Sequence, residues 1–325
     1  WLFTHSSPSA RVMSVLFAAS FNIVSSVSII LVNKQIASVC GFDFILTMLF
    51  LNFLTTATLL EGLAALRWFE KKHLPTRERW IVAGMALSTV LLNNCSNEAN
   101  SVGFYQITKL LIIPTVIGLE RLQGRRAVYS QKVILSIVVT GVGVALATVS
   151  DFEVNVRGSI LALMSIISTA QYQIWQGSKQ HEHGVTPTQI TYSVAWPQSC
   201  AGLVCALLAD VWLPQVKVLF LMRPSTLLEH KLSGQGDLYW IVLCNLLAVC
   251  TNISVYGLIG KTSPITYQVV GQLKTVMVVA FGYIFFDVRV PWQWLLLRFT
   301  GVAIAIVGVI SYAIIKNAEA KDKKT

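Results

Sequence analysis

The sequence predicts an all-α polytopic membrane protein with ten transmembrane helices in two inverted five-helix repeats. Three observations predict it: the composition, ten long apolar segments and a duplicated motif. Of the 325 residues, 54% are hydrophobic and only 12% are charged, whereas about a quarter of the residues of a soluble domain are charged. The composition therefore excludes an ordinary soluble protein.

The apolar segments each contain roughly 20 residues, the length that an α-helix needs to cross about 30 Å of hydrocarbon. In chain order they are residues 11–33, 42–66, 80–97, 101–120, 131–150, 158–178, 188–213, 238–259, 264–286 and 291–315. The first five form the predicted first repeat, residues 11–150, and the last five form the second, residues 158–315. Residues 1–10 and 316–325 flank the repeats as a short N-terminal segment and a basic tail.

The distribution of positive charge predicts the orientation. An even number of spans places both termini on one side of the membrane. If that side is the cytoplasm, sixteen Lys and Arg residues lie in cytoplasmic segments and five lie on the opposite side. Cytoplasmic loops are enriched in Lys and Arg, so we expect both termini in the cytoplasm. The net charge of +10 then reflects membrane orientation, and a nucleic-acid partner is not expected.

A motif in the fourth span recurs in the ninth. The segment SVGFYQITKLLIIPTV, from residue 101, aligns with SPITYQVVGQLKTVMV, from residue 263, at a separation of 162. Tyr105 and Gln106 thereby match Tyr267 and Gln268. The copies lie five spans apart, an odd number, so they cross the membrane in opposite directions. Such an inverted repeat is typical of alternating-access transporters, whose site lies near the midplane between the repeats.

Two lysines of these spans are the strongest site candidates. Lys109 and Lys274 lie about eight and ten residues into their spans, roughly 12 to 15 Å deep. A charge at the bilayer centre costs at least about 2.5 to 3.5 kcal/mol and usually marks a functional site. No acid is expected at that depth, because Glu61, Asp151, Asp237 and Asp287 fall near span ends. Two lysines without an acid predict an anionic ligand such as a phosphate or diphosphate.

Helical spacing tests this arrangement. Lys109 follows Tyr105 by four residues, and Tyr267, Gly271 and Lys274 are spaced by four and three, so each set projects from one face of its helix. Gly271 would leave room for a ligand to approach the backbone. The predicted binding set also includes Gln106, Gln268 and the hydroxyl groups of Tyr105, Tyr267 and Thr275.

Other polar residues within the spans could hold the remainder of a ligand. Tyr172, Tyr192 and Asn252 suit a nucleobase or a sugar, by stacking and by hydrogen bonds at low dielectric. Packing between helices is the alternative role for each of them. Lys34 lies nearer the membrane surface, where snorkelling to the headgroups and ligand binding both remain open.

These segments resemble a known family. The motifs GFYQITK, YQIWQGSKQHE, VNK at 32–34 and GKTSPITYQVVGQLKT resemble the nucleotide-sugar and triose-phosphate translocators of the drug/metabolite transporter superfamily. The likeness is greatest to the branch with a Lys-Thr pair in the ninth span, which includes the E branch of solute carrier family 35 and plant carriers of UDP-sugars. It implies ten helices in two inverted repeats, and exchange of a nucleotide sugar for a nucleoside monophosphate in Golgi or endoplasmic reticulum membranes. By this likeness Lys274 and Thr275 hold phosphate, with Lys109 opposite.

Two departures from the family pattern bear on the substrate. Guanosine-diphosphate-mannose carriers have Gly-Ala-Leu-Asn-Lys and Phe-Tyr-Asn-Asn blocks where this chain has GQLK and TYSV, so a guanine pocket is not expected. Plastid phospho-sugar exchangers have Lys-Arg at the positions of Lys274 and Thr275. Thr275 therefore favours a UDP-sugar, with a plastid-type phosphorylated-sugar/phosphate exchanger as the alternative.

The remaining motifs add partners and exclusions. His181 and His183 of HEHG lack Cys partners, so a solvated cytoplasmic turn is expected rather than a metal site. No cofactor is expected, and no nucleophile–base pair suggests an enzyme. Lys321 and Lys323 of the terminal KDKKT resemble a dilysine retrieval signal that coat proteins recognise. The lipid bilayer is the other expected partner, and homodimerisation is left open.

Overall fold

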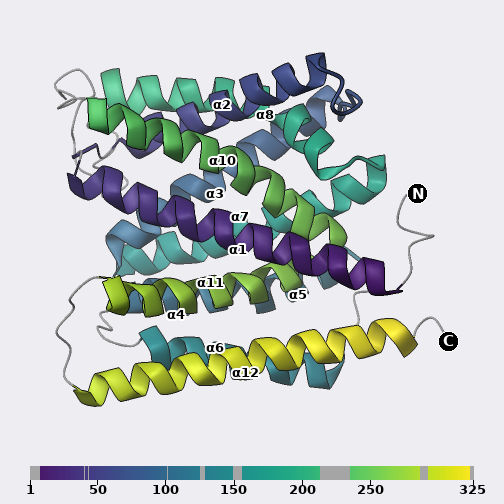
Figure 1. The fold of residues 1–325 in the computed structure, drawn as a ribbon, viewed down its shortest axis with the longest axis vertical. Coiled ribbons are helices and arrows are strands. Elements are labelled where there is room, and N and C mark those ends of the chain that lie inside the picture. The colour runs from purple at the N-terminus through teal and green to yellow at the C-terminus, as the bar shows by residue number, and fades with distance from the viewer. Residues whose placement is uncertain are drawn as a thin grey trace. The chain divides into compact units, whose positions relative to one another are not determined.

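The computed structural model describes residues 8–39, 41–42, 44–100, 102–124, 129–148, 156–212, 235–285 and 292–322. Every regular element in these residues is helical (Figure 1). In chain order they are α1 (Pro8–Val39), α2 (Ile45–Ala65), α3 (Thr76–Ala99), α4 (Val102–Leu110), α5 (Ile112–Leu122), α6 (Gln131–Thr148), α7 (Val156–His183), α8 (Pro187–Ala206), the π-helix η1 (Leu207–Trp212), α10 (Gln235–Lys261), α11 (Pro264–Phe285) and α12 (Trp292–Asp322).

Several of these helices can cross a membrane. Within the described residues, five segments are long and apolar enough: Met13–Asn33, Ile45–Ala65, Pro187–Trp212, Asp237–Lys261 and Phe299–Lys316. Their large apolar side chains are often exposed, as at Phe17 and Val307, which suits contact with lipid rather than water. The predicted all-helical membrane character is therefore confirmed. The ten spans and their inverted repeat stay predictions.

The fourth predicted span was expected to be one continuous helix, but it breaks at Leu111. Pro114 is the cause, because it has no N–H to donate to the carbonyl of Leu110, four residues earlier. The N–H of Leu111 donates to the Thr108 carbonyl at 3.0 Å, and regular α-helical bonding resumes from Thr115 to Leu111 at 3.1 Å. Pro114 thus lies in the first turn of α5, and Tyr105 and Lys109 lie on the shorter helix α4.

The helices group into two compact units. Unit 1 contains Trp1–Cys95 and Tyr172–Ser263, and unit 2 contains Ser96–Gln171 and Pro264–Thr325. Each unit therefore combines helices from both predicted repeats. The fourth and ninth spans, which carry the duplicated motif, belong to the same unit.

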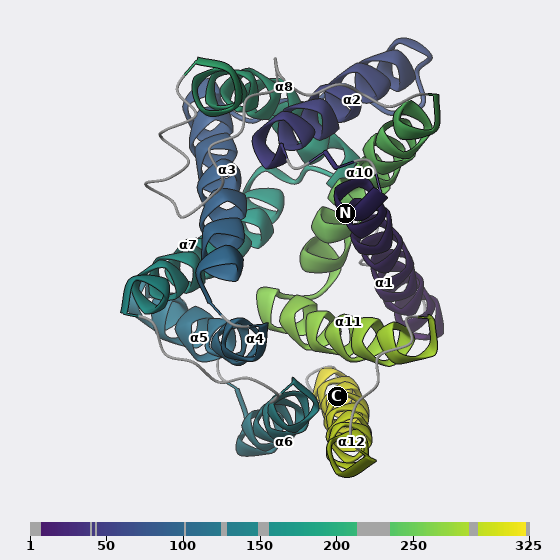
Figure 2. The same ribbon diagram turned by 90° about the vertical axis from the view of Figure 1, so that its left-hand side faces the viewer.

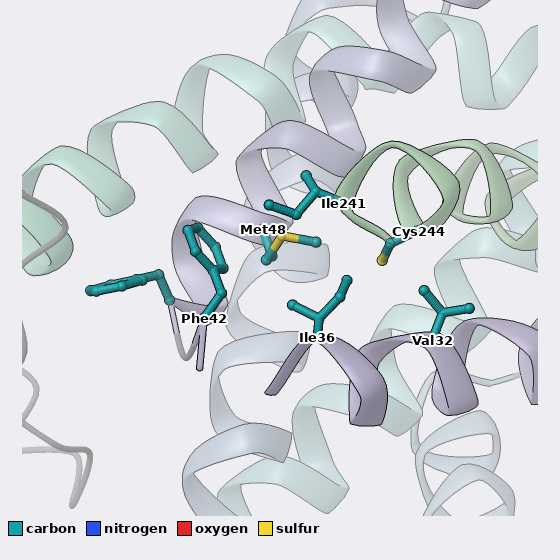
Figure 3. Packing of buried hydrophobic residues seen from close by; sticks show 7 residues of the cluster. Val32, Ile36, Phe42, Met48, Ile241 and Cys244 are labelled. Carbon is teal, nitrogen blue, oxygen red and sulfur yellow. The ribbon is translucent and has the colours of Figure 1, made fainter. Parts of the chain in front are cut away.

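Unit 1 has an apolar core where α1, α2 and α10 meet (Figure 3). Val32 and Ile36 of α1 pack with Ile241 and Cys244 of α10, and Met48 of α2 closes the cluster. Ile36 and Cys244 are essentially inaccessible to solvent. This core joins α1 and α10, which carry Lys34 and Asn252, to α2.

The start of α2 depends on an acid far away in the sequence. Phe44, at the N-cap, provides no side-chain cap, and the first N–H groups of a helix have no partner within it. Asp210 of η1 provides one: its Oδ2 accepts the Thr47 N–H at 2.9 Å and the Thr47 hydroxyl at 2.7 Å. Asp210 is fully buried but lies near the end of the segment Pro187–Trp212, so the expectation of no acid near the midplane stays a prediction.

We expect Asp210→Ala to destabilise the protein by about 1 to 3 kcal/mol, because it leaves two buried donors of Thr47 without this acceptor. Asp210→Asn retains an acceptor oxygen and should lose less. Thermal unfolding of the purified protein in detergent measures both changes. Adding Thr47→Val to Asp210→Ala should cost little more, and full additivity of the two changes would contradict the cap.

In unit 2, α6 and α12 lie side by side (Figures 1 and 2) and approach to backbone contact. A methyl group on Gly143 would collide with the backbone nitrogen of Ala305 and lie 2.7 Å from the Gly301 carbonyl oxygen. One on Gly301 would collide with Ala147, and one on Gly308 would lie 2.6 Å from the Thr140 nitrogen. As residue numbers increase along α6, the numbers of their contact partners on α12 decrease, so the two helices are antiparallel. Small residues permit such close packing in membrane proteins.

Candidate anion-binding site

The first lysine–tyrosine pair lies on α4. Lys109 Nζ is 4.2 Å from the centroid of the Tyr105 ring, within the range of a cation–π interaction. Both side chains are half-buried. The four-residue spacing predicted that they share a helix face, and the structure places them in contact.

The second pair lies on α11. Lys274 Nζ is 4.9 Å from the centroid of the Tyr267 ring, two helical turns earlier. Lys274 is only 8% exposed, as expected for a lysine deep in a span. The charge of Lys109 acts on Lys274 by electrostatic repulsion. Unit 2 therefore contains both lysines of the duplicated motif, and two like charges favour an anionic ligand.

Gly271 keeps the surface of α11 open beside Lys274. Among the described residues, a Cβ atom there would meet only Gln268 Oε1, at 4.0 Å, so a ligand could approach the helix backbone. Thr275 donates its hydroxyl to the Gly271 carbonyl at 3.3 Å, which leaves its oxygen able to accept. Gln268 is buried. Gln106 lies in α4, but its side chain is outside the described residues.

Unit 2 also contains a buried acid that the sequence motifs did not indicate. Glu120, near the end of α5, is 8% exposed and accepts the Tyr129 hydroxyl at 2.8 Å. Lys316 of α12 lies over the Tyr129 ring, with Nζ 5.3 Å from its centroid. Glu120 thus ties the end of α5 to the segment before α6. Its position at the predicted end of the fourth span gave no signal of this burial.

The other predicted binding residues belong to unit 1. Tyr172 of α7 shares a hydrogen bond of 3.2 Å with the Tyr256 hydroxyl of α10. Asn252 of α10 donates to Thr56 Oγ1 of α2 at 3.1 Å. Both predicted residues are half-buried. These contacts join helices of unit 1, and a ligand role for either residue stays a prediction. The side chain of Lys34 on α1 lies outside the described residues.

Tyr192 takes part in a dense set of contacts at the start of α8. Its hydroxyl donates to Glu61 Oε2 at 2.9 Å, and Lys71 Nζ lies 2.6 Å from Glu61 Oε1. Its ring packs against Phe69, at 5.6 Å, and His73, at 5.0 Å between centroids. These contacts suit the packing role left open above, and the predicted ligand role for Tyr192 stays a prediction.

The HEHG segment is not the solvated turn we expected. Helix α7 continues to His183, whose Nε2 lies 2.7 Å from Glu78 Oε2. Lys179 Nζ lies 2.7 Å from a carboxylate oxygen of both Glu78 and Glu182. Donor atoms of Glu78, Glu182 and His183 lie within 4.8 Å of one another, and the Lys179 ammonium already provides a positive charge there.

This network makes the stability depend on pH. Burial alone would raise the pKa of Glu78, but hydrogen bonds with Lys179 and His183 outweigh it and lower the pKa below its ordinary 4.5. A carboxyl group with a lowered folded-state pKa stabilises the protein fully above its unfolded pKa, and this contribution is lost as the pH falls through the folded value. As the pH decreases below 4.5, we expect the unfolding temperature of the wild type to fall more steeply than that of Glu78→Gln. Equal slopes for the two proteins would contradict a stabilising role of the Glu78 carboxylate.

The fold defines the class of protein: a helical membrane protein, in which Lys109 and Lys274 remain the candidates for an anion site. The sequence matches the Triose-phosphate Transporter family over residues 12–313, and the chain belongs to this family. It is 34% identical to UDP-xylose transporter 2 of Arabidopsis thaliana over 315 residues, which cover 96% of this chain and 84% of that protein. It is also 34% identical to UDP-rhamnose/UDP-galactose transporter 1 of Arabidopsis thaliana over 298 residues, covering 91% and 82%.

A solved crystal structure agrees at the level of the fold. It matches with a TM-score of 0.63 and 13% sequence identity, over 96% of this chain and 99% of its own. At that identity the likeness concerns the fold alone.

Proposed function

We propose that the protein is a nucleotide-sugar transporter, with a UDP-sugar as substrate, that exchanges it for a nucleoside monophosphate by alternating access. One observation carries the proposal: Lys109 and Lys274, from the two copies of the duplicated motif, lie in one compact unit, each over the ring of the repeated tyrosine. Relatives named as UDP-xylose and UDP-rhamnose/UDP-galactose transporters, at 34% identity over nearly the whole chain, support uridine nucleotides.

In this proposal the two ammonium groups bind the phosphate oxygens. Charge-assisted hydrogen bonds to phosphate are among the strongest in proteins, and the hydroxyl groups of Thr275, Tyr105 and Tyr267 complete the set. Open space beside Gly271 admits the ligand. Threonine rather than arginine after Lys274 suits a ligand with a smaller density of charge than a free phospho-sugar. Tyr172, Tyr192 and Asn252 are the candidates for the base and the sugar.

The packing of α6 on α12 supports the inverted repeat. Gly143 meets Ala305 at the centre of this antiparallel contact, and the two positions are 162 residues apart, the same separation as the two motif copies. If position i of one repeat corresponds to position i+162 of the other, Gly143 packs against its own equivalent. Where equivalent helices of inverted repeats pack on each other at a two-fold axis, positions at the axis contact their own equivalents. The repeat was inferred from the fourth and ninth spans, so this support comes from a different pair of helices.

Exchange rather than uniport follows from the charge of the site. Without an anion, two like charges must pass through the occluded state in a medium of low dielectric, which is costly. Bound phosphate offsets that charge. We also propose that the protein acts in a Golgi or endoplasmic reticulum membrane with both termini in the cytoplasm.

Uptake into proteoliposomes tests the proposal. Vesicles preloaded with UMP should take up labelled UDP-xylose, UDP-galactose or UDP-rhamnose much faster than empty vesicles. Guanosine-diphosphate-mannose serves as the negative control. Uptake of triose phosphate against inorganic phosphate, without uptake of any UDP-sugar, would contradict the proposal and favour the plastid-type exchanger.

A further inference from the structure

The two lysines make the same kind of contact with a tyrosine ring, although the spacing from tyrosine to lysine differs between the motif copies. In each motif copy an ammonium group lies over the ring of the repeated tyrosine, at 4.2 Å for Lys109 on Tyr105 and 4.9 Å for Lys274 on Tyr267. The lysines themselves are not equivalent positions: with the 162-residue separation, Lys109 matches Gly271 and Lys274 matches Ile112. The spacing from tyrosine to lysine is four residues in one copy and seven in the other. Because the contact recurs although the spacing differs, duplication alone does not account for it.

The contact between lysine and tyrosine stabilises buried positive charge during the proposed transport cycle. A cation over an aromatic face is stabilised, and more strongly when it is desolvated than at an exposed site. Lys274 is largely buried, and Lys109 repels it. A carrier that works by exchange must hold these charges both in the presence of an anion and in the step without one.

We propose that the rings of Tyr105 and Tyr267 are the positioning partners of the two lysines in the substrate-free step of transport. The ring faces hold the ammonium groups until the phosphate oxygens of the ligand take over. This inference rests on the function proposed above and adds to it. The rings then determine how readily the carrier reorients without cargo, and so the ratio of uniport to exchange.

Thermal unfolding of variants that lack the tyrosine ring, measured with and without UMP, tests the proposal. Tyr105→Leu and Tyr267→Leu remove the aromatic face, while Tyr105→Phe and Tyr267→Phe are matched controls that remove only the hydroxyl. Without ligand, each Leu variant should unfold about 2 to 4 °C below its Phe counterpart. With saturating UMP this difference should shrink to less than half, because the phosphate replaces the ring.

A difference that is unchanged by UMP would show that the rings only pack, and would overturn the inference. If UMP shifts neither the wild type nor any variant, the proposed function fails with it; if UMP shifts the wild type and the Leu–Phe difference persists, only this inference fails. Tyr105→Met and Tyr267→Met replace any Leu variant that does not fold.

Transport gives a second readout. Relative to uptake into UMP-loaded vesicles, uptake into empty vesicles should fall roughly 3- to 10-fold in the Leu variants. The Phe variants should lose overall rate, because the hydroxyl groups belong to the phosphate site, but should keep the wild-type ratio. Equal ratios in the Leu and Phe variants would overturn the inference.

Discussion

Lys274→Ala is expected to abolish nucleotide-sugar exchange, with a loss of at least about 100-fold in uptake. Removing one partner of a buried, charge-assisted contact typically costs about 2 to 5 kcal/mol, and about 2.7 kcal/mol corresponds to a factor of 100. Lys109→Ala should have a similar effect, since in the proposed site the ligand contacts both ammonium groups. Uptake of labelled UDP-sugar into UMP-loaded vesicles measures both.

The control for this prediction is Lys132→Ala. Lys132 is an exposed lysine of α6 in the same unit, so the change removes equal charge without touching the site. Lys274→Arg should also impair transport, because the planar guanidinium is larger and binds phosphate with a different geometry. Near-normal exchange by Lys109→Ala and Lys274→Ala would show that neither lysine belongs to the binding site.

Gly143→Leu is expected to prevent stable packing of α6 on α12 and to abolish recovery of folded protein. A single methyl group on Gly143 already meets backbone atoms of Ala305 and Gly301, and a backbone cannot move aside as a flexible side chain can. Overpacking a tight core costs about 1 to 3 kcal/mol, sometimes more. Size-exclusion chromatography in detergent and thermal unfolding measure the outcome, with Gly143→Ala expected to show a smaller loss.

Gly118→Leu is the matched control. Gly118 lies on α5 of the same unit, and within the part of the chain that the structure describes a Cβ atom there meets nothing within 4 Å. The variant should express and unfold much as the wild type does. If Gly143→Leu and Gly118→Leu behave alike, close packing of α6 on α12 is not required for folding.

The parts of the site that follow from helical periodicity could be predicted from the sequence. Four residues separate Tyr105 from Lys109, and seven separate Tyr267 from Lys274; at 3.6 residues per turn both pairs must share a face. The structure places each pair in contact. The helical and membrane character likewise follows from composition and segment length.

Other features depend on contacts that a local pattern does not carry. Asp210 is buried because it caps Thr47, 163 residues away, and no motif near either residue indicates this. The segment from Lys179 to His183 is polar, so hydropathy ended the sixth span at 178, whereas ion pairs with Glu78 keep α7 helical to His183. The break at Leu111 could have been predicted, because Pro114 removes a donor from the helix.

The grouping of helices into units also lay beyond the sequence. Repeats suggest that residues 11–150 and 158–315 form the natural halves, yet the compact units combine segments of both. The choice of partners depends on surface fit between helices, as where Gly143 admits the backbone of Ala305. That choice places Lys109 and Lys274 in one unit.

A thermal-shift titration of the purified protein with UMP, GMP, inorganic phosphate and triose phosphate tests the central claim most directly. A ligand that binds only the folded state stabilises it by RT ln(1 + [L]/Kd), and at 100 times Kd this is about 2.7 kcal/mol. We predict a shift with UMP, little with GMP, and loss of the UMP shift in Lys274→Ala. A shift with phosphate or triose phosphate but none with UMP would contradict the account.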